Sequence, residues 1–257
     1  MSSAKILNFF IVINSLNEDA TEFMYMLGIH LRPGMLTNMM LEKREYEICR
    51  QCRNSKVTVE KEHIHKVIWD MTQEEWNRGN ITLNELLKKG HVEDIECECD
   101  RCEATTTRYK VTTVSKAPTR LLIHLNRAVN MLDRNVANAA YYVHDEENYR
   151  DLITYPVTFP RVLEYNIKTL NNINSDNSDL FQERNVQYSL QGVICVKIQQ
   201  HIPDIKCHYN CHCLNEDGIW VHYDDYESKD SELIDEVQDQ FQSDTVTALF
   251  YKRMSNI

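Results

Sequence analysis

The chain lacks an excess of positive charge. Of its 257 residues, 28 are Lys or Arg and 39 are Asp or Glu, which gives a formal net charge of −11 at pH 7. A chain with this balance has no electrostatic footprint for nucleic acid, so we expect no nucleic-acid partner. The negative charge is compatible with a basic partner and equally with simple solubility.

A long apolar segment is also missing. The apolar run near the N-terminus covers residues 6–13, which is too short to cross a bilayer as a helix. No small-residue cleavage site follows this run, so it does not match a secretory signal. We therefore expect a buried strand or helix at this position and no membrane partner.

Glycine is scarce, with only 6 residues, whereas the hydrophobic content is an ordinary 42%. A chain of this length and composition can bury a substantial core, as one large domain or two small ones. Few glycines, mixed helices and many strands that do not pair in simple sequence order predict the α+β fold class.

Periodic patterns place the expected elements. Apolar residues at three- and four-residue spacing predict a helix over 17–31 with Asn17 as its N-cap, and a short helix is expected over 82–89 with Thr82 as its cap. Alternation predicts strands over 56–60 and 109–114, and the short apolar run 120–125 suits a buried strand. Further strands are expected over 187–198, 206–214, 220–223 and 245–251. Residues 128–150 are expected to be irregular, and the Asn-, Asp- and Ser-rich residues 170–184 are expected to form a loop.

Two C-x-x-C pairs, Cys49 with Cys52 and Cys99 with Cys102, carry most of the functional information. Each pair brings two thiolates to one side of a tight turn, and two turns complete the tetrahedral sulfur set that Zn²⁺ prefers. The spacing predicts a structural zinc site that ties hairpin ends together. The alternative is four reduced, partly buried thiols without a metal.

The cysteine count also bears on the compartment. Nine cysteines is an odd number, and most of them do not form a secreted disulfide framework. Paired metal-type cysteines together with free thiols indicate a reducing environment, so we expect a cytoplasmic or nuclear protein.

His208 lies in a strand-like stretch, and Asp224 and Asp225 follow the next predicted strand. Two antiparallel strands joined by the loop 215–218 would place His208 opposite this acidic pair. A carboxylate that orients an imidazole forms the rear half of a nucleophile–base–orienter triad. The alternative is a surface hydrogen bond between two neighbouring strands.

The same stretch, residues 206–213, is rich in Cys and His, which raises the question of a second metal. Strand alternation places His208, Asn210 and His212 on one face and the three cysteines of this stretch on the other. We therefore expect those cysteines to be small core residues rather than ligands.

These pieces occur in an order that resembles the ubiquitin-specific protease family of cysteine deubiquitinases. Residues 17–23 resemble the family's Q-x-D-A-x-E-F box, and the two C-x-x-C pairs match the zinc ribbon of its fingers subdomain. Further matches, to the P-x-x-L-x-I-H-L-K-R-F, F-P, Y-x-L-x-A-V-I, G-H-Y, W-x-x-F-D-D and A-Y-x-L-F-Y-x-R segments, lie at 117–127, 155–160, 188–194, 207–209, 220–225 and 248–253.

The resemblance implies a papain-like fold shaped as a hand. Residues 1–40 would be the remnant of a truncated helical thumb, residues 41–115 the zinc-ribbon fingers, and residues 116–257 the palm. It further implies that His208 is the general base, with Asp224 as its orienter and Asp225 beside it. Asp19, Glu22 and Tyr209 would contact ubiquitin, the two carboxylates by pairing with arginines in its C-terminal tail.

The departures from the family pattern concern the nucleophile. The family's catalytic cysteine lies in a G-N-T-C-Y-x-N-S box upstream of the Q box, and here no cysteine precedes Cys49. In addition, Asn17 replaces the glutamine of the Q box, and Cys207 replaces the glycine before the histidine. No other cysteine in the chain has a suitable predicted setting beside His208, since a reactive thiolate needs an electropositive site within reach of its base.

Three hypotheses follow. In the first, the chain is part of a deubiquitinase that hydrolyses bonds at the C-terminus of ubiquitin, with its nucleophile outside this chain. In the second, it is a pseudoenzyme that binds ubiquitin without turnover. In the third, it is a zinc-stabilised interaction scaffold with no role in ubiquitin recognition.

Overall fold

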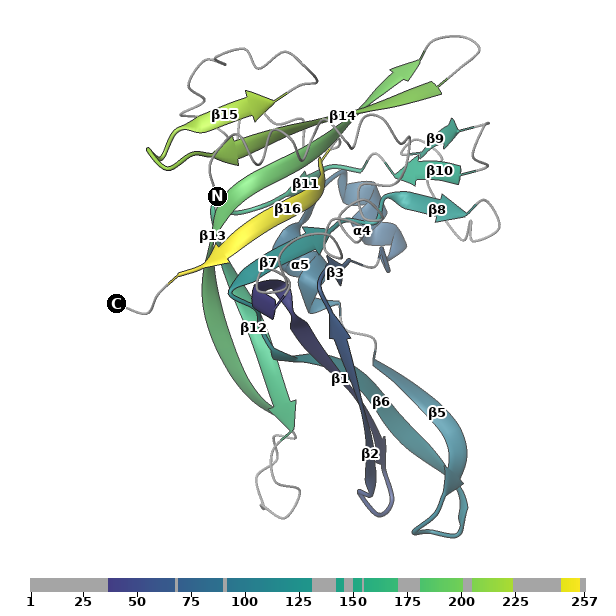
Figure 1. Ribbon diagram of the computed structural model, residues 1–257. Helices are drawn as coiled ribbons and strands as arrows, with labels where there is room; N and C mark the ends of the chain where they lie inside the picture. The colour runs from purple at the N-terminus through teal and green to yellow at the C-terminus, as the bar shows by residue number, and fades with distance from the viewer. Residues whose placement is uncertain are drawn as a thin grey trace.

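The computed structural model describes residues 37–67, 69–89, 92–130, 142–145, 150–153, 155–170, 181–200, 205–223 and 246–254. Two antiparallel-rich sheets dominate this part of the chain, with two short helices between them (Figure 1). The helix expected over 17–31 lies outside the described residues. Among the residues described, no helix is long and apolar enough to cross a membrane.

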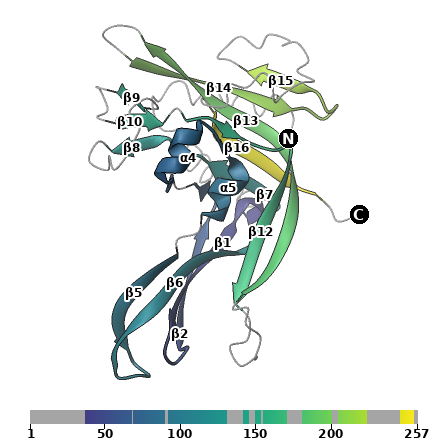
Figure 2. The same cartoon turned by 180° about the vertical axis from the view of Figure 1, so that it is seen from behind.

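The first sheet has four strands in the order β2-β1-β6-β5, all antiparallel. Their bounds are Ser55–Glu62 (β2), Leu41–Cys49 (β1), Ala104–Lys116 (β6) and Val92–Cys99 (β5). Figures 1 and 2 show that this sheet extends away from the rest of the molecule and carries the β1–β2 and β5–β6 turns at its far end. We call it the finger sheet.

Strand alternation gives the finger sheet one apolar face. Tyr46, Ile48 and Val111 are buried on that face, because β1 and β6 are the two inner strands. The Tyr46 ring meets the edge of Phe181 with 5.5 Å between centroids. This contact joins the finger sheet to the second sheet, since Phe181 begins β13.

The second sheet has seven strands, six of them in the order β15-β14-β13-β16-β7-β3, and β12 also pairs with β13. The bounds are Trp220–Tyr223 (β15), Ile205–Leu214 (β14), Phe181–Gln200 (β13), Val246–Arg253 (β16), Arg120–His124 (β7), His65–Lys66 (β3) and Val162–Leu170 (β12). The 20-residue β13 is its organising strand, because β12 pairs with its first half and β14 with its second. We call it the palm sheet.

Helices α4 (Gln73–Arg78) and α5 (Leu83–Lys88) are fixed by sequence-local signals. Each begins at a threonine that forms a capping box with the glutamate three residues later, Thr72 with Glu75 and Thr82 with Glu85. Their apolar residues, including the buried Trp76, join the main core beneath the palm sheet. The segment 63–89 therefore packs with the palm core although finger strands precede and follow it.

Smaller strands complete the structure. β8 (Ala128–Asn130), β10 (Arg150–Ile153) and β9 (Tyr142–Asp145) form a three-stranded sheet, and β4 (Ile81–Thr82) pairs in parallel with β11 (Val157–Thr158). The buried Arg127 lies at the junction, where its guanidinium donates to the carbonyls of Ile153 and Tyr155 at 2.8 and 2.9 Å and to that of Val246. One buried cation thus ties three chain segments together.

Three buried tyrosines span the core and satisfy their hydroxyls at its boundary. Tyr188 donates to the carbonyl of Pro118 at 2.5 Å, Tyr251 to that of Pro160 at 2.8 Å, and Tyr155 to that of Glu75 at 2.5 Å. Because a buried hydroxyl without a partner is costly, these bonds allow large aromatic side chains to fill the interior.

Most predicted elements are confirmed. The strands expected over 56–60, 109–114, 120–125, 187–198, 206–214, 220–223 and 245–251 correspond to β2, β6, β7, β13, β14, β15 and β16, and the expected helix with Thr82 as its cap is α5. Two expectations were wrong in part. Residues 128–150 contain β8 and β9 and the start of β10, and the expected loop 170–184 is strand at Leu170 and from Phe181 onward. Cross-strand pairing overrides the polar composition of these stretches.

Candidate functional site

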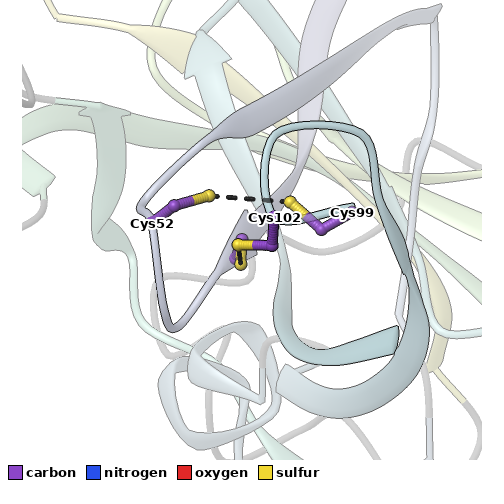
Figure 3. A group of neighbouring side chains, drawn as sticks. Cys52, Cys99 and Cys102 are labelled. Atoms are coloured by element: carbon purple, nitrogen blue, oxygen red, sulfur yellow. Dashed lines mark hydrogen bonds between the residues drawn. The ribbon is translucent and has the colours of Figure 1, made fainter. Parts of the chain in front are cut away.

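The four predicted cysteines converge at the far end of the finger sheet. Cys49 ends β1 and Cys99 ends β5, and Cys52 and Cys102 lie in the turns that follow these strands. All four sulfur atoms lie within 4.8 Å of one another, although the two pairs come from different hairpins. Figure 3 shows the sulfurs of Cys52 and Cys99 facing each other from two separate loops.

The two cysteine turns have the same backbone design. In each, the residue after the second cysteine donates its N–H to the carbonyl of the first, Arg53 to Cys49 at 2.9 Å and Glu103 to Cys99 at 2.8 Å. Arg53 and Glu103 also share a left-handed backbone, with φ of 56° and 51°. Such a turn wraps backbone around the sulfurs and is costly for non-glycine residues unless the surroundings hold it. Both hairpins are thus shaped to present two sulfurs inward.

The sulfur positions fit a tetrahedral metal. A tetrahedron with metal–sulfur bonds of about 2.3 Å has edges of about 3.8 Å between sulfurs. The sulfurs of Cys52 and Cys99 are 3.5 Å apart, and those of Cys49 and Cys102 are 3.9 Å apart. These distances bracket the expected edge, and all four thiols are free rather than joined in disulfides. The cluster can therefore hold a metal ion.

The pKa values of the clustered thiols differ from one another. A hydrogen bond with the Thr106 hydroxyl, at 3.4 Å from the sulfur, together with the backbone N–H of Cys52 lowers the pKa of Cys49 to about 6. The pKa of Cys99 is also lowered, mainly by the backbone N–H of Cys102. The pKa of Cys102 is raised to about 12, mainly because its side chain is hydrogen-bonded to Cys52, which favours the protonated thiol. A bound cation would favour the thiolate form of the cysteines instead.

Two residues of the cluster's surroundings escaped the sequence analysis. Thr106 lies on β6 opposite Cys97 and contacts the Cys49 sulfur. The buried Arg108 also lies on β6, where it pairs with Cys49 of β1. Its guanidinium donates to the carbonyl of Glu98 at 2.9 Å and contacts the Glu47 carboxylate at 3.4 Å. Alternation along 104–116 places both side chains on one face, but only the pairing register shows that this face meets the cysteines.

The predicted palm hairpin exists. β14 and β15 pair antiparallel, with Cys211 opposite Tyr223 and His212 opposite His222, and the Asn215 side chain accepts from the N–H groups of Asp217 and Ile219 in the connecting turn. His208 belongs to β14, opposite Lys197 of β13.

The remaining predicted site residues are placed less completely. Asp224 and Asp225, and likewise Asp19 and Glu22, lie outside the described residues. Tyr209 is half-buried on β14 and packs against a small apolar cluster that includes Leu122 and Cys211.

The alternation expected for β14 holds where its side chains are described. Cys211 is buried in the small apolar cluster and Cys213 packs against it, whereas His212 stacks on His222 with 4.4 Å between ring centroids. Cys195, opposite Asn210, is buried in the main core. Cys211 is thus a small core residue, as the alternation predicted, and Cys195 is a second one. The described part of the chain holds one candidate metal cluster, which is the one in the finger sheet.

Comparison with known proteins agrees with this architecture. The model of the ubiquitin carboxyl-terminal hydrolase family matches residues 8–251. No curated protein sequence matches the chain. Among solved structures, the SAGA DUB module of Ubp8, Sgf11, Sus1 and Sgf73 bound to ubiquitin aldehyde superposes with a TM-score of 0.60 at 18% identity, over 86% of this chain and 42% of that one.

Two further structures of this module are similar. A complex of mutant Ubp8 with monoubiquitin gives a TM-score of 0.65 at 17% identity, over 93% of this chain and 49% of that one. A yeast SAGA DUB module with mutant Sgf73 gives 0.58 at 19% identity, over 96% and 49%. The present chain thus spans about half the length of the chains it matches. With a family model that covers nearly all of its length, the chain belongs to the ubiquitin carboxyl-terminal hydrolase family and has the fold of its ubiquitin-specific proteases.

Proposed function

We propose that the chain is a ubiquitin-specific-protease-like module that binds ubiquitin and does not by itself cleave ubiquitin conjugates. The family match over residues 8–251 carries this proposal. The similar Ubp8 modules are bound to ubiquitin aldehyde and to monoubiquitin in their structures, and this chain shares their fold over 86% and 93% of its length.

The proposal assigns half of a catalytic triad to the palm. His208 is the general base, Asp224 orients its imidazole, and Asp225 lies beside it in sequence. The hairpin supports this assignment, because β14 and β15 run antiparallel and their last described pair is Cys211 with Tyr223. From that pair, the chain segments leading to His208 and to Asp224 leave the same end of the hairpin.

The nucleophile is what the chain itself does not provide. No cysteine precedes Cys49, and four of the later cysteines form the finger cluster. Cys195 and Cys211 are buried, so no substrate carbonyl reaches them. Because the chain spans about half the length of its structural relatives, a thiol supplied from outside these 257 residues would complete the triad.

Within this proposal, the finger cluster binds Zn²⁺ in a structural role. Four cysteine sulfurs leave no open coordination position for a substrate or a water, which is typical of structural zinc. The metal would join the β1–β2 turn to the β5–β6 turn. The same proposal divides the chain into a thumb remnant (1–40), fingers (41–115) and palm (116–257), of which residues 63–89 pack on the palm core.

The free thiols also bear on where the chain works. Cys49, Cys52, Cys99 and Cys102 are placed to bind a metal and not to form disulfides. Thiolate zinc sites persist in reducing compartments, so we place the module in the cytoplasm or the nucleus.

Turnover is tested with ubiquitin that carries a fluorophore on its C-terminal amide. The purified chain should release no dye above background, because a base and its orienter do not form a covalent intermediate without a thiolate. Dye release that His208→Ala abolishes would contradict the proposal, because it would identify one of the nine cysteines as a nucleophile.

A further inference from the structure

Strand β2 forms one edge of the finger sheet. It pairs with β1 on one side, and no strand among the described residues pairs with its other side. Residues 56–61 are all exposed, and Val57 and Val59 are 44% and 50% exposed, which is unusual for side chains of this type. An exposed edge strand with β-branched residues is a ready template for another strand.

The backbone of β2 determines which residues can pair outward. Cys49 donates its N–H to the carbonyl of Asn54 at 2.9 Å, and the two residues continue the β1–β2 register. Hydrogen-bonded and non-bonded pairs alternate along an antiparallel ladder. The even-numbered residues of β2 therefore bond to β1, and the N–H and C=O groups of Val57, Val59 and Lys61 point away from the sheet.

The sequence of this edge is complementary to itself. When two copies of β2 run antiparallel with Thr58 opposite its own counterpart, Val57 faces Val59 and Lys56 faces Glu60, each pair occurring twice. This register brings the outward odd-numbered residues of both copies opposite each other, as an antiparallel ladder requires. It also places the exposed valines on one face and the opposite charges on the other.

The other edge of the same sheet shows the contrast. Strand β5 carries Glu93, Asp94, Glu96 and Glu98 and no basic residue. An antiparallel pair of β5 strands would bring carboxylates together, and like charges across a ladder are destabilising. Self-pairing is thus favoured at β2 and opposed at β5.

We propose that β2 is a self-association edge through which two copies of this chain pair antiparallel about Thr58. The two finger sheets then become one eight-stranded sheet, in which a two-fold axis between the two β2 strands relates the order β5-β6-β1-β2 of one copy to that of the other. Such an interface is isologous and closes on itself, so it yields a dimer and not a filament. It lies in the finger sheet and goes beyond the proposed ubiquitin binding.

Sedimentation velocity over a concentration series tests this dimer. The wild type should show a reversible monomer–dimer equilibrium that weakens as salt rises, because part of the attraction is between exposed charges. Lys56→Glu and Glu60→Lys should each raise the dimer dissociation constant at least about tenfold, since each turns two attractive cross-strand pairs into two repulsive ones. A wild type that remains monomeric at every concentration overturns the proposal.

The double variant, Lys56→Glu with Glu60→Lys, is the decisive control. It restores opposite charges between the two copies, so dimerisation should return to within a few-fold of the wild type. Within one copy the double variant instead creates like-charge pairs, because Lys56 lies opposite Glu47 and Glu60 lies opposite Lys43 in the β1–β2 ladder. A hairpin damaged by the substitutions would therefore dimerise worst in the double variant, and that result would also overturn the proposal. Circular dichroism and thermal unfolding of each monomer confirm that the variants are folded.

Discussion

His65 is a half-buried histidine that the fold holds in its neutral form. It lies on β3, its Nδ1 is hydrogen-bonded to the Tyr165 hydroxyl, and the two rings meet edge to face at 5.7 Å. Burial, together with the nearby charge of Lys43, lowers the pKa of His65 to about 3. In the unfolded chain the pKa of a histidine is about 6.5, so acid favours the unfolded state.

This shift predicts a specific loss of stability in acid. The folded pKa lies below the unfolded one, so the contribution of His65 is complete above about pH 6.5 and is lost toward pH 3, by about 1.4 kcal/mol per pH unit at most. His65→Asn keeps a polar side chain but does not titrate. Urea unfolding should show that the variant is less stable at pH 7 and that its deficit shrinks between pH 6.5 and 4.5. A deficit that is constant with pH would assign the acid sensitivity to other groups.

The sequence pattern identified the four clustered cysteines but not the residues that support them. The C-x-x-C spacing specifies a local turn, so the identity of four cysteines could be read directly. Thr106 and Arg108 act through the β1–β6 and β5–β6 registers, which join residues far apart in the chain. A register of this kind depends on the whole sheet, and no local pattern near either residue encodes it.

The two cysteine turns should act as one metal-dependent element. Elemental analysis is expected to find about one zinc per chain. Cys99→Ser should abolish zinc binding, because it removes one of the four thiolates. A structural zinc site contributes on the order of 10 kcal/mol of folding free energy in small domains. Cys97→Ser is the matched control, since Cys97 lies on the same strand but outside the cluster. Equal zinc content in both variants, or a well-folded protein without zinc, would contradict the assignment.

Elements with strong local signals were predictable, and those made by pairing were not. The capping box at Thr82 located α5, and the β14–β15 hairpin followed from alternation around a polar turn. The equivalent box at Thr72, which begins α4, carries the same local signal, so α4 is equally predictable from the sequence. By contrast, the strand character of Phe181–Arg184 comes from its pairing with β12, which the polar sequence does not reveal.

At the scale of the whole molecule, the order of the motifs predicted the fold better than any single element did. Each motif alone was weak, yet their succession matched the family across nearly the whole chain. The path of residues 63–89 was harder to predict from the sequence. Trp76, Leu83 and Leu86 pack in the palm core, because β3 pairs with β7 and β4 with β11. These pairings join segments that are far apart in the sequence, so no local pattern within 63–89 reveals them, and the family resemblance includes the stretch in the finger range 41–115.

Ubiquitin binding is the central property proposed for this chain, and the acidic pair Asp19 and Glu22 offers its most specific test. In the family resemblance these carboxylates pair with arginines in the ubiquitin tail. A partly desolvated Arg–carboxylate contact contributes about 2–3 kcal/mol, whereas an exposed one contributes at most about 1. We therefore expect weak, saturable binding that Asp19→Ala with Glu22→Ala reduces several-fold, with a difference that shrinks as salt rises.

The most direct measurement is a titration of labelled ubiquitin with the wild type, this double variant and a charge-matched control. Asp70→Ala with Glu74→Ala serves as the control, because both side chains are exposed and it removes the same charge. The wild type and the control should bind ubiquitin alike, and the Asp19 and Glu22 variant should bind several-fold more weakly. A wild type that does not bind ubiquitin would contradict the account and leave a zinc-stabilised scaffold as the function of this fold.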